Sequence, residues 1–263
     1  MDLGLNGKVA VVTAASRGLG FAAAMELARE GANIAICSRE KSSIEKAAAE
    51  IEKATGVSTL PVVTDVKHEN EISSLISATV QHFGQLDILV TNAGGPPAGY
   101  FDDIDDTGWL AGFELTMLSA TRLIRAALPH MKRQQWGRVV NILSISVKQP
   151  IAGLMISNAL RPALVGLAKS LADEVAEQGI TVNNVCPGWT KTERITEIIN
   201  ARAQAHNCTT EDVLDDILKN IPVGRMGLPA ELASVITFLC SNQAAFMTGA
   251  TIPVDGGANR GLM

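Results

Sequence analysis

The sequence predicts an α/β protein organised around one doubly wound parallel sheet with helices on both faces. Segments typical of strands and of helices alternate from end to end, as in parallel sheets joined by helical crossovers. The first strand, residues 8–14 (KVAVVTA), is an uninterrupted apolar run, the pattern of a strand buried on both faces. A glycine loop, a helix and a second strand at 33–37 follow, which together have the size of one βαβ unit.

Length and composition favour one large domain, residues 1–263. Of 263 residues, 47% are apolar and 19% are charged, which is enough apolar material for a sizeable core. The net charge of −5, with acids and bases interspersed, argues against nucleic-acid binding. We find neither an apolar run of transmembrane length nor a basic leader with a cleavage site, and therefore expect a cytoplasmic protein with no membrane partner. The four cysteines and four histidines are scattered, so we expect no metal.

The remaining elements follow in order along the chain. Further strands are expected at 59–63, 86–90, 139–143, 180–185 and 251–254. Helices are expected at 21–30, 43–54, 69–83 and 107–134, after Pro150, and at 229–241. Because Pro162 directly follows Arg161, the helix after Pro150 is expected to begin at Pro162 or to bend there. Residues 189–227 are polar and weakly patterned, and we assign them to a substrate lid and pocket wall.

The loop between the first strand and the first helix predicts a dinucleotide site. It reads Thr13-Ala14-Ala15-Ser16-Arg17-Gly18-Leu19-Gly20. The glycines let backbone approach a pyrophosphate, and the N-terminus of the helix supplies N–H donors and a positive dipole. An ordinary strand-to-helix turn would leave Arg17 inside the loop unexplained.

The end of the second strand favours NADP(H) over NAD(H). An acidic residue there would bind the ribose 2′-hydroxyl, but the strand is followed by Ser38 and Arg39. Both suit a 2′-phosphate, with Arg17 as a second cation. A solvated arginine at a strand end is the alternative.

Five motifs in order make the chain resemble the short-chain dehydrogenase/reductase family over nearly its whole length. TAASRGLG is similar to the family's T-G-x-x-x-G-x-G loop, with Ala14 at the first glycine. The other matches are the adenine-contacting pair Asp65-Val66, the motif Asn92-Ala93-Gly94, Pro187-Gly188 with the carboxamide-binding Thr192, and Asp255-Gly256-Gly257. The resemblance, which is to 3-oxoacyl-(acyl carrier protein) reductase-like members, implies a Rossmann-type sheet of about seven strands and a homo-oligomer, a tetramer or a dimer.

The same resemblance fails at the catalytic residues. The family uses an asparagine, serine, tyrosine and lysine tetrad, which would fall on Thr116, Ser144, Ser157 and Arg161, so only the serine is kept. A tyrosine whose pKa is lowered by lysine can protonate an alkoxide at neutral pH. A serine hydroxyl is far less acidic, and arginine stays charged. We therefore expect Ser157 and Arg161, at i and i+4, to bind ribose hydroxyls or a substrate carboxylate or phosphate.

Ser144 and Lys148 complete the candidate catalytic set of Ser144, Lys148, Ser157 and Arg161. Ser144 ends a buried strand at the sheet edge where such folds bind ligands, and we assign it as a donor to a substrate oxygen. Lys148 is a candidate acid if burial lowers its pKa, and a surface lysine otherwise. Tyr100, the only tyrosine, is expected to line the mouth of the pocket.

The sequence thus predicts an NADP(H)-dependent oxidoreductase acting on a carbonyl group or activated double bond of a small or acyl-type substrate, with non-standard proton delivery. Two alternatives stay open: an NADP-binding pseudo-enzyme or sensor, and a redox-silent lyase on the same scaffold. Tight NADPH binding without turnover would favour the sensor, and no binding would favour the lyase.

Overall fold

A computed structural model describes residues 2–261. Its strands are β1 (Val9–Val12), β2 (Asn33–Ser38), β3 (Thr59–Val63), β4 (Ile88–Thr91), β5 (Gly137–Ile142), β6 (Ile180–Pro187) and β7 (Thr251–Val254). Its α-helices are α1 (Gly18–Arg29), α2 (Lys41–Thr55), α3 (Glu69–Phe83), α4 (Asp106–Phe113), α5 (Ser119–Gln134), α6 (Met155–Val175), α7 (Glu193–His206), α8 (Thr210–Lys219) and α9 (Pro229–Cys240).

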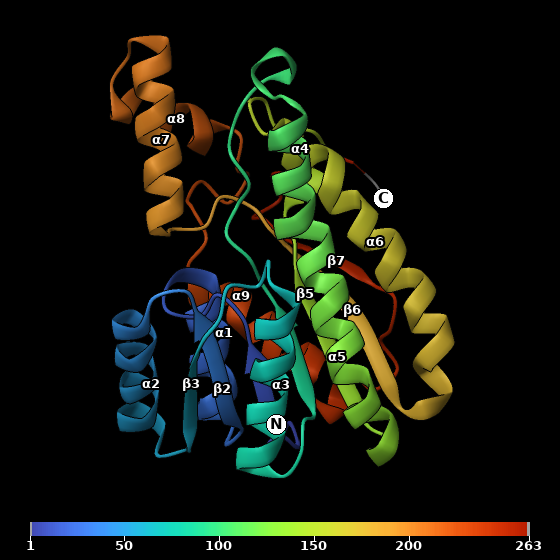
Figure 1. Ribbon diagram of the computed structural model, residues 1–263. Helices are drawn as coiled ribbons and strands as arrows, with labels where there is room; N and C mark the ends of the chain where they lie inside the picture. Colours follow the sequence, from blue (N-terminus) through green and yellow to red (C-terminus); the bar gives the residue numbers. More distant parts are fainter. Residues whose placement is uncertain (1, 262–263) are drawn as a thin grey trace.

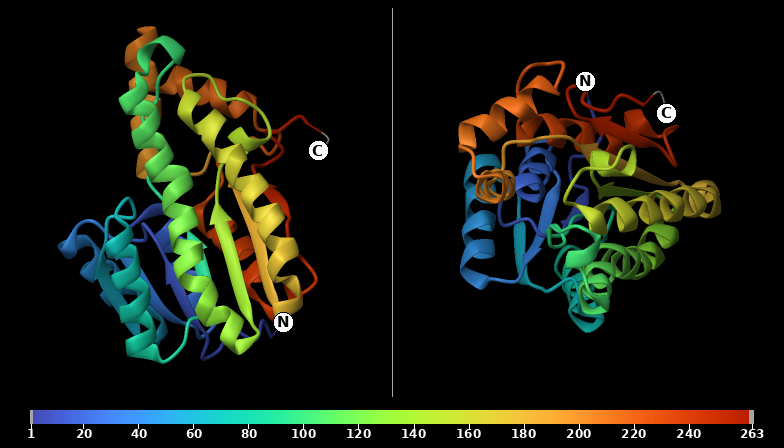
Figure 2. Two further views of the ribbon diagram at one scale, coloured as in Figure 1. Left: turned by 45° about the vertical axis from the view of Figure 1, so that its right-hand side comes forward. Right: turned by 90° about the horizontal axis from the view of Figure 1, so that it is seen from above.

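All seven strands form one parallel sheet in the order β3-β2-β1-β4-β5-β6-β7. Helices α1, α2 and α9 pack on one face and α3, α5 and α6 on the other, as Figures 1 and 2 show. The chain reverses direction across the sheet between β1 and β4, and ligands of such folds bind at this switch point. The predicted seven-stranded doubly wound sheet is therefore confirmed.

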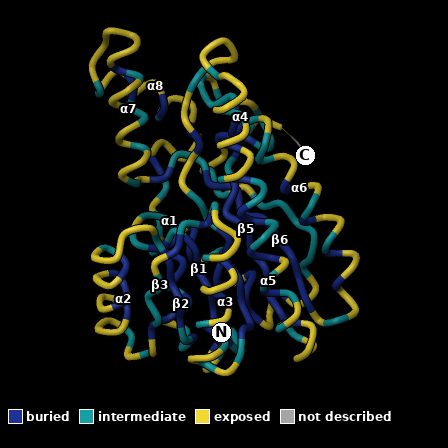
Figure 3. Tube along the Cα trace, viewed as in Figure 1, coloured by how far each residue is buried: buried dark blue, intermediate teal, exposed yellow. Residues whose placement is uncertain are grey.

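The strands form because their residues are buried on both faces. Every residue of β1, β4, β5 and β6 is buried, and the helices add their apolar stripes to two core clusters, one on each face. Figure 3 shows this as a dark band of buried residues through the sheet, with exposed residues in α2, α7 and the loop before α4. A third cluster packs the C-terminal half of the lid region against β6 and α6.

A row of polar side chains crosses four neighbouring strands inside the sheet. Thr91 Oγ1 on β4 donates to Asn141 Oδ1 on β5 at 2.7 Å. Asn141 Nδ2 donates to Asn184 Oδ1 on β6 at 2.9 Å, and Asn184 Nδ2 donates to Thr251 Oγ1 on β7 at 3.0 Å. Buried polar groups need such partners. Thr91 is the last residue of β4, and the other three members of this polar row lie one to three residues before the ends of their strands.

Three segments differ from the sequence-based expectations. The helix expected at 107–134 is divided into α4 and α5 by a π-helical turn, Glu114–Leu118. Helix α6 begins at Met155 and runs through Pro162, so the expectation that a helix starts at that proline was wrong. Pro162 is exposed, so its ring lies away from the packed face. The region 189–227 contains two helices, α7 and α8, which stand above the C-terminal ends of the strands in Figure 1.

Within residues 2–261, no helix is both long enough and apolar enough to span a bilayer.

Candidate functional site

A cavity of about 610 Å³ opens where the C-terminal ends of the strands meet the lid region, residues 189–227. Its walls come from the segments after β1 through β6 and from helices α4, α6 and α7. Most of the residues singled out from the sequence line it, namely Ser16, Arg17, Gly18, Leu19, Ser38, Arg39, Asp65, Val66, Asn92, Ala93, Gly94, Ser144, Ser157, Arg161, Pro187, Gly188 and Thr192. Because parallel strands end at one edge, residues far apart in sequence meet here.

The glycine loop has the geometry of a phosphate cradle. Helix α1 begins at Gly18, whose φ of +63° favours glycine, and the preceding Arg17 makes no side-chain cap. The first N–H groups of α1 therefore stay available to an anion at the cavity wall. Gly20 has no room for a side chain, since a Cβ would lie 2.5 Å from the Ala14 carbonyl oxygen.

Two of the predicted cofactor residues support this loop rather than line the cavity. Thr13 Oγ1 donates to the Asn92 carbonyl at 2.7 Å and accepts from the Asn92 N–H at 2.8 Å, which joins the ends of β1 and β4. Gly20 lets the loop pack on Asn92, whose Nδ2 donates to the Ala14 carbonyl at 3.2 Å. The loop is thus rigidly held, and it fits a pyrophosphate-bearing cofactor.

Basic side chains gather at the end of the cavity formed by β2 and β3. Arg39 is exposed there, and among the described residues it has neither a hydrogen-bond nor an ion-pair partner. Arg17 is differently placed, because its guanidinium pairs with Glu193 at the start of α7. Lys67, which was not selected from the sequence, also lines this end, and its Nζ lies 3.9 Å from Oδ2 of Asp65.

Ser144, Ser157 and Arg161 meet at the opposite end of the cavity. The Oγ of Ser144, at the end of β5, accepts from the Ser146 N–H at 3.1 Å, which leaves the hydroxyl proton free. Arg161 Nε donates to Ser157 Oγ at 3.0 Å, so the two lie on one face of α6. Ser146 Oγ lies 3.2 Å from Ser157 Oγ. If Ser146 donates to Ser157, the Ser157 hydroxyl can donate into the cavity.

Arg161 is a fixed cation. Its Nη1 donates to the carbonyls of Leu143 at 2.8 Å and Ile142 at 3.3 Å. Burial lowers the pKa of Arg161 to about 10, and the thiol of Cys186 raises it in part. At neutral pH the guanidinium is still charged in all but about one molecule in a thousand. No carboxylate pairs with it in residues 2–261.

Thr116, where the resemblance places the family's asparagine, lies in the π-helical turn. Its Oγ1 is buried and has no hydrogen-bond partner in the described chain. Thr116 and Arg161 both line a second cavity of about 20 Å³ beside the main one. A space of this size holds about one water molecule.

Lys148 and Tyr100 lie apart from this group. Lys148 does not line the cavity. The charge of Lys148 instead acts on the thiol of Cys186. Burial raises the pKa of this thiol to about 11, and the positive charges of Lys148 and Arg161 lower it in part. Tyr100 is 59% exposed at the start of a short 3-10 turn and is absent from the cavity wall, so the expectation that it lines the pocket mouth was wrong.

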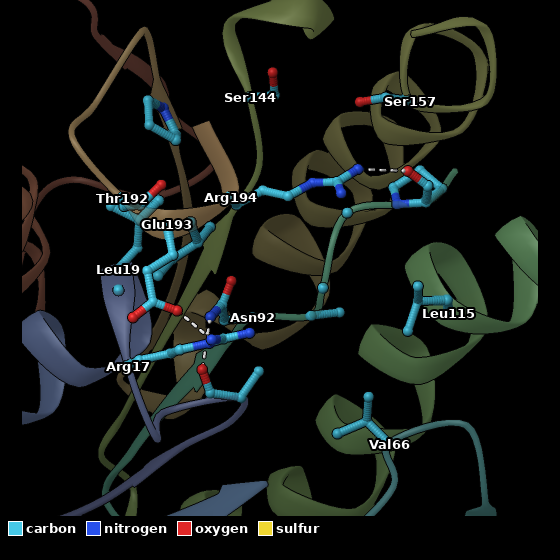
Figure 4. Close-up of a pocket in the computed structure, with 18 of the residues that line it drawn as sticks. Arg17, Leu19, Val66, Asn92, Leu115, Ser144, Ser157, Thr192, Glu193 and Arg194 are labelled. Carbon is cyan, nitrogen blue, oxygen red and sulfur yellow. Dashed lines mark hydrogen bonds and ion pairs between the residues drawn. The ribbon is translucent and has the colours of Figure 1, made fainter. Parts of the chain in front are cut away.

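Helix α7 supplies cavity residues that the sequence analysis did not select: Glu193, Arg194, Ile195, Glu197 and Ile198. Arg194 reaches across to the Pro96 carbonyl, with an Nη2–O distance of 3.4 Å (Figure 4). Thr192 caps α7 by accepting from the Ile195 N–H at 3.4 Å, which leaves its hydroxyl proton free. The region assigned to a pocket wall therefore does contribute one. Among the described residues, no cluster of metal-ligating side chains is present.

A doubly wound sheet with a glycine loop at its switch point is typical of the class of dinucleotide-binding proteins. A family model described as "Enoyl-(Acyl carrier protein) reductase" matches residues 13–259. The chain belongs to the short-chain dehydrogenase/reductase family.

Particular relatives match along almost the whole chain. The 3-oxoacyl-(acyl carrier protein) reductase FabG of Pseudomonas aeruginosa is 38% identical over 255 residues, covering 97% of this chain and 98% of the relative. Dehydrogenase/reductase SDR family member 4 of Oryctolagus cuniculus is 34% identical, covering 97% and 94%. The structure of L-sorbose reductase from Gluconobacter frateurii, complexed with NADPH and L-sorbose, superimposes with a TM-score of 0.94 at 32% identity and covers all of both chains.

Proposed function

We propose that this protein is an NADP(H)-dependent reductase of a carbonyl group or activated double bond in a small or acyl-type substrate. The observation that carries the proposal is that one cavity joins the glycine loop to the hydroxyl groups of Ser144 and Ser157, which are backed by the partly buried cation of Arg161. Hydroxyl donors placed where negative charge develops are what hydride addition to a carbonyl requires.

The glycine loop would hold NADPH, and the chemistry that this cofactor would supply is a hydride for the substrate carbon. Ser144 and Ser157 then donate hydrogen bonds to the oxygen that gains negative charge, as an oxyanion hole does. Arg161 holds the Ser157 oxygen as an acceptor and so directs its proton toward the cavity. The Ser146 hydroxyl, 3.2 Å from Ser157 Oγ, would support the same orientation when it is the donor of that hydrogen bond.

The proton that completes the product comes from water, because no tyrosine, histidine or cysteine of the described chain lines the cavity. The carbonyl compound, one NADPH and one proton give the alcohol and NADP⁺. This is the non-standard proton delivery that the sequence predicts. Lys148 has no direct part in it, since it lies off the cavity wall.

The preference for NADPH over NADH rests on Arg39. This arginine is exposed at the β2 end of the cavity without a described partner, so a 2′-phosphate can pair with it at no cost in broken contacts. Arg17 would have to share its charge with Glu193. The structural neighbours include both an actinorhodin polyketide ketoreductase with NADPH and an NAD⁺-bound xylitol dehydrogenase. The proposed preference for NADPH therefore rests on Arg39 and not on these neighbours.

The test combines cofactor binding with turnover. NADPH titration followed by nucleotide fluorescence should show saturable binding, and NADPH oxidation should occur with at least one member of a panel of ketones, quinones and acyl thioesters. The double variant Ser144→Ala/Ser157→Ala should lose about 100-fold or more in kcat. Ser170→Ala, an exposed serine on the same helix α6, is the matched control and should keep full turnover.

The absence of tyrosine, histidine and cysteine from the described cavity wall also favours a second candidate, a non-catalytic NADP-binding protein. Tight NADPH binding without turnover on any member of the panel would favour this candidate and contradict the reductase. Absence of NADPH binding would contradict both and favour a redox-silent lyase.

We also infer a homo-oligomer, a tetramer or a dimer, as family membership implies. Large apolar side chains remain exposed on the surface, including Phe101, Leu110, Phe113 and Phe246, and exposed apolar patches commonly mark protein interfaces. Light scattering on a size-exclusion column should give a multiple of the chain mass, and a monomer would contradict this inference.

A further inference from the structure

The end of the cavity that is lined by Ser144, Ser157 and Arg161 is called the substrate end here. The positive charges of its arginines exceed the negative charges of the carboxylates that are free to pair with them. Arg161 on α6 and Arg194 on α7 line this end. Of the two acidic residues of α7 in the lining, Glu193 pairs with Arg17 and Glu197 contacts Arg194. Arg161 has no carboxylate partner among the described residues. Buried or partly buried cations are normally paired, because removing their hydration is costly.

Arg194 is also only weakly engaged. Its Nη1 lies 3.3 Å from a carboxylate oxygen of Glu197, one helical turn along, and both side chains are about half exposed. Exposed pairs of this kind contribute little. Its other contact, Nη2 to the Pro96 carbonyl, is long at 3.4 Å. Arg194 can therefore exchange both partners for an anion at small cost.

The surroundings strengthen any charge pairing at this place. Leu115, Leu154, Ile195 and Ile198 give the substrate end apolar walls. A substrate packed against them would displace water, and its charge pairing with Arg194 would become stronger. Figure 4 shows Arg194 pointing across the cavity from α7, with Leu115 on the opposite wall. The cavity is thus built to surround a small molecule with arginine, hydroxyl and apolar groups together.

We propose that the substrate is an oxo acid whose carboxylate binds Arg194, while Ser144 and Ser157 hold its carbonyl oxygen. This inference rests on the proposed reductase function and names its substrate class. Arg194 is a binding residue that closes α7 onto the carboxylate through a bidentate, charge-assisted pair. Arg161 is a positioning residue, because Nε and Nη1 are occupied by Ser157 and by strand-end carbonyls, and it adds the positive field of a fixed cation.

The test compares short-chain 2-oxo and 3-oxo acids with their methyl esters and amides as substrates for the NADPH-bound enzyme. The measured quantity is the ratio of kcat/KM for each acid to that for its ester. We expect the acid to be favoured by about tenfold or more, and Arg194→Gln to lower this ratio by about 10- to 100-fold, mainly through KM. Arg194→Lys should retain part of the ratio, because it keeps the charge but loses bidentate geometry.

Arg202→Gln is the matched control. Arg202 also lies on α7 and donates to the Ala152 carbonyl at 3.2 Å, but it does not line the cavity, so the ratio should be unchanged. Urea unfolding midpoints of all three variants show whether each is folded.

Esters or amides preferred to acids, or a ratio unchanged by Arg194→Gln in a folded variant, would overturn the oxo-acid assignment while leaving the reductase intact. Faster reduction of carbonyl compounds that carry a phosphate instead of a carboxylate would overturn the carboxylate assignment. No reduction of acids, esters, amides or neutral ketones would overturn the reductase and the assignment together.

Discussion

The proposed proton delivery predicts an unusual pH profile. In an enzyme with an ionising tyrosine and lysine, kcat changes as the catalytic group titrates. Here the cavity wall has no tyrosine, histidine or cysteine among the described residues, and those are the side chains whose ordinary pKa values lie between about 6 and 10. We therefore expect kcat for reduction to be flat from about pH 6 to about pH 9.

Arg161 sets the upper limit of the plateau. Burial lowers its pKa to about 10, so the cation that supports Ser157 begins to be lost only as the pH approaches that value. Because the charged form is the one that favours the oxyanion, the rate should fall as the pH rises through about 10. It should not fall on the acidic side of neutrality for this reason.

The assay is the initial rate of NADPH oxidation at saturating cofactor and substrate, in buffers of constant ionic strength. A step in kcat with a midpoint near neutrality would refute the reasoning, since it would reveal an ionising proton donor. If that step vanished in Lys148→Met, the lysine rather than water would be the donor.

Four further results are expected. Lys148→Met should keep turnover within about twofold, since its side chain lies off the cavity; a loss of tenfold or more, measured by NADPH oxidation, would restore it as a catalytic residue. Arg39→Ala should weaken NADPH binding by about tenfold or more with little change for NADH, and Lys41→Ala, an exposed neighbour paired with Glu45, should change neither. Ala14 has a φ of +48°, a conformation that costs a non-glycine residue about 1 kcal/mol or more. Ala14→Gly should therefore raise the free energy of unfolding, measured in urea, by up to about 1 kcal/mol. A decrease of that size would contradict the backbone strain at Ala14. Arg161→Gln should lower the unfolding free energy by about 2 kcal/mol, because two strand-end carbonyls lose their donor, and an unchanged midpoint would show that those bonds contribute nothing.

The fold was readable from the sequence because its signals are local. Strands β3 and β7 and helix α3 have the predicted limits, and each is followed by a polar or glycine residue that ends its regular pattern. The errors came where tertiary packing or weaker signals decided the outcome. Pro162 was expected to start or bend a helix, yet the apolar face of α6 continues past it from Ile156 to Val175, and packing outweighed the local preference.

Helices α7 and α8 were missed although capping signals were present. Thr192 caps α7, and Thr209 with Asp212 forms a capping box at the start of α8. Their apolar stripes are short, because these helices cover the sheet edge rather than the core, so the periodicity looked weak. A search for threonine caps would have found both.

The site was predictable in position and not in its contacts. The motif spacing predicted that Gly18, Asn92 and Ser144 follow strands of one parallel sheet. The strand order places all three at the same edge of that sheet, where they line the cavity. That Arg161 would bond carbonyls 18 and 19 residues earlier depends on how α6 crosses the end of β5. Arg194 gave no signal, since a lone arginine in a polar helix is ordinarily solvated.

The polar row across β4 to β7 has a consequence for how precisely the site is held. If any of these strands slipped by one residue, its buried asparagine or threonine would turn to the opposite face of the sheet. Two inter-strand side-chain bonds would break at Asn141 or Asn184, and their amides would be left unsatisfied in the core. These side-chain hydrogen bonds thus disfavour alternative strand registers. The strand ends that carry Asn92, Ser144 and Pro187 therefore keep fixed positions relative to one another along the strand direction. A hydride donor and its acceptor need such a fixed alignment.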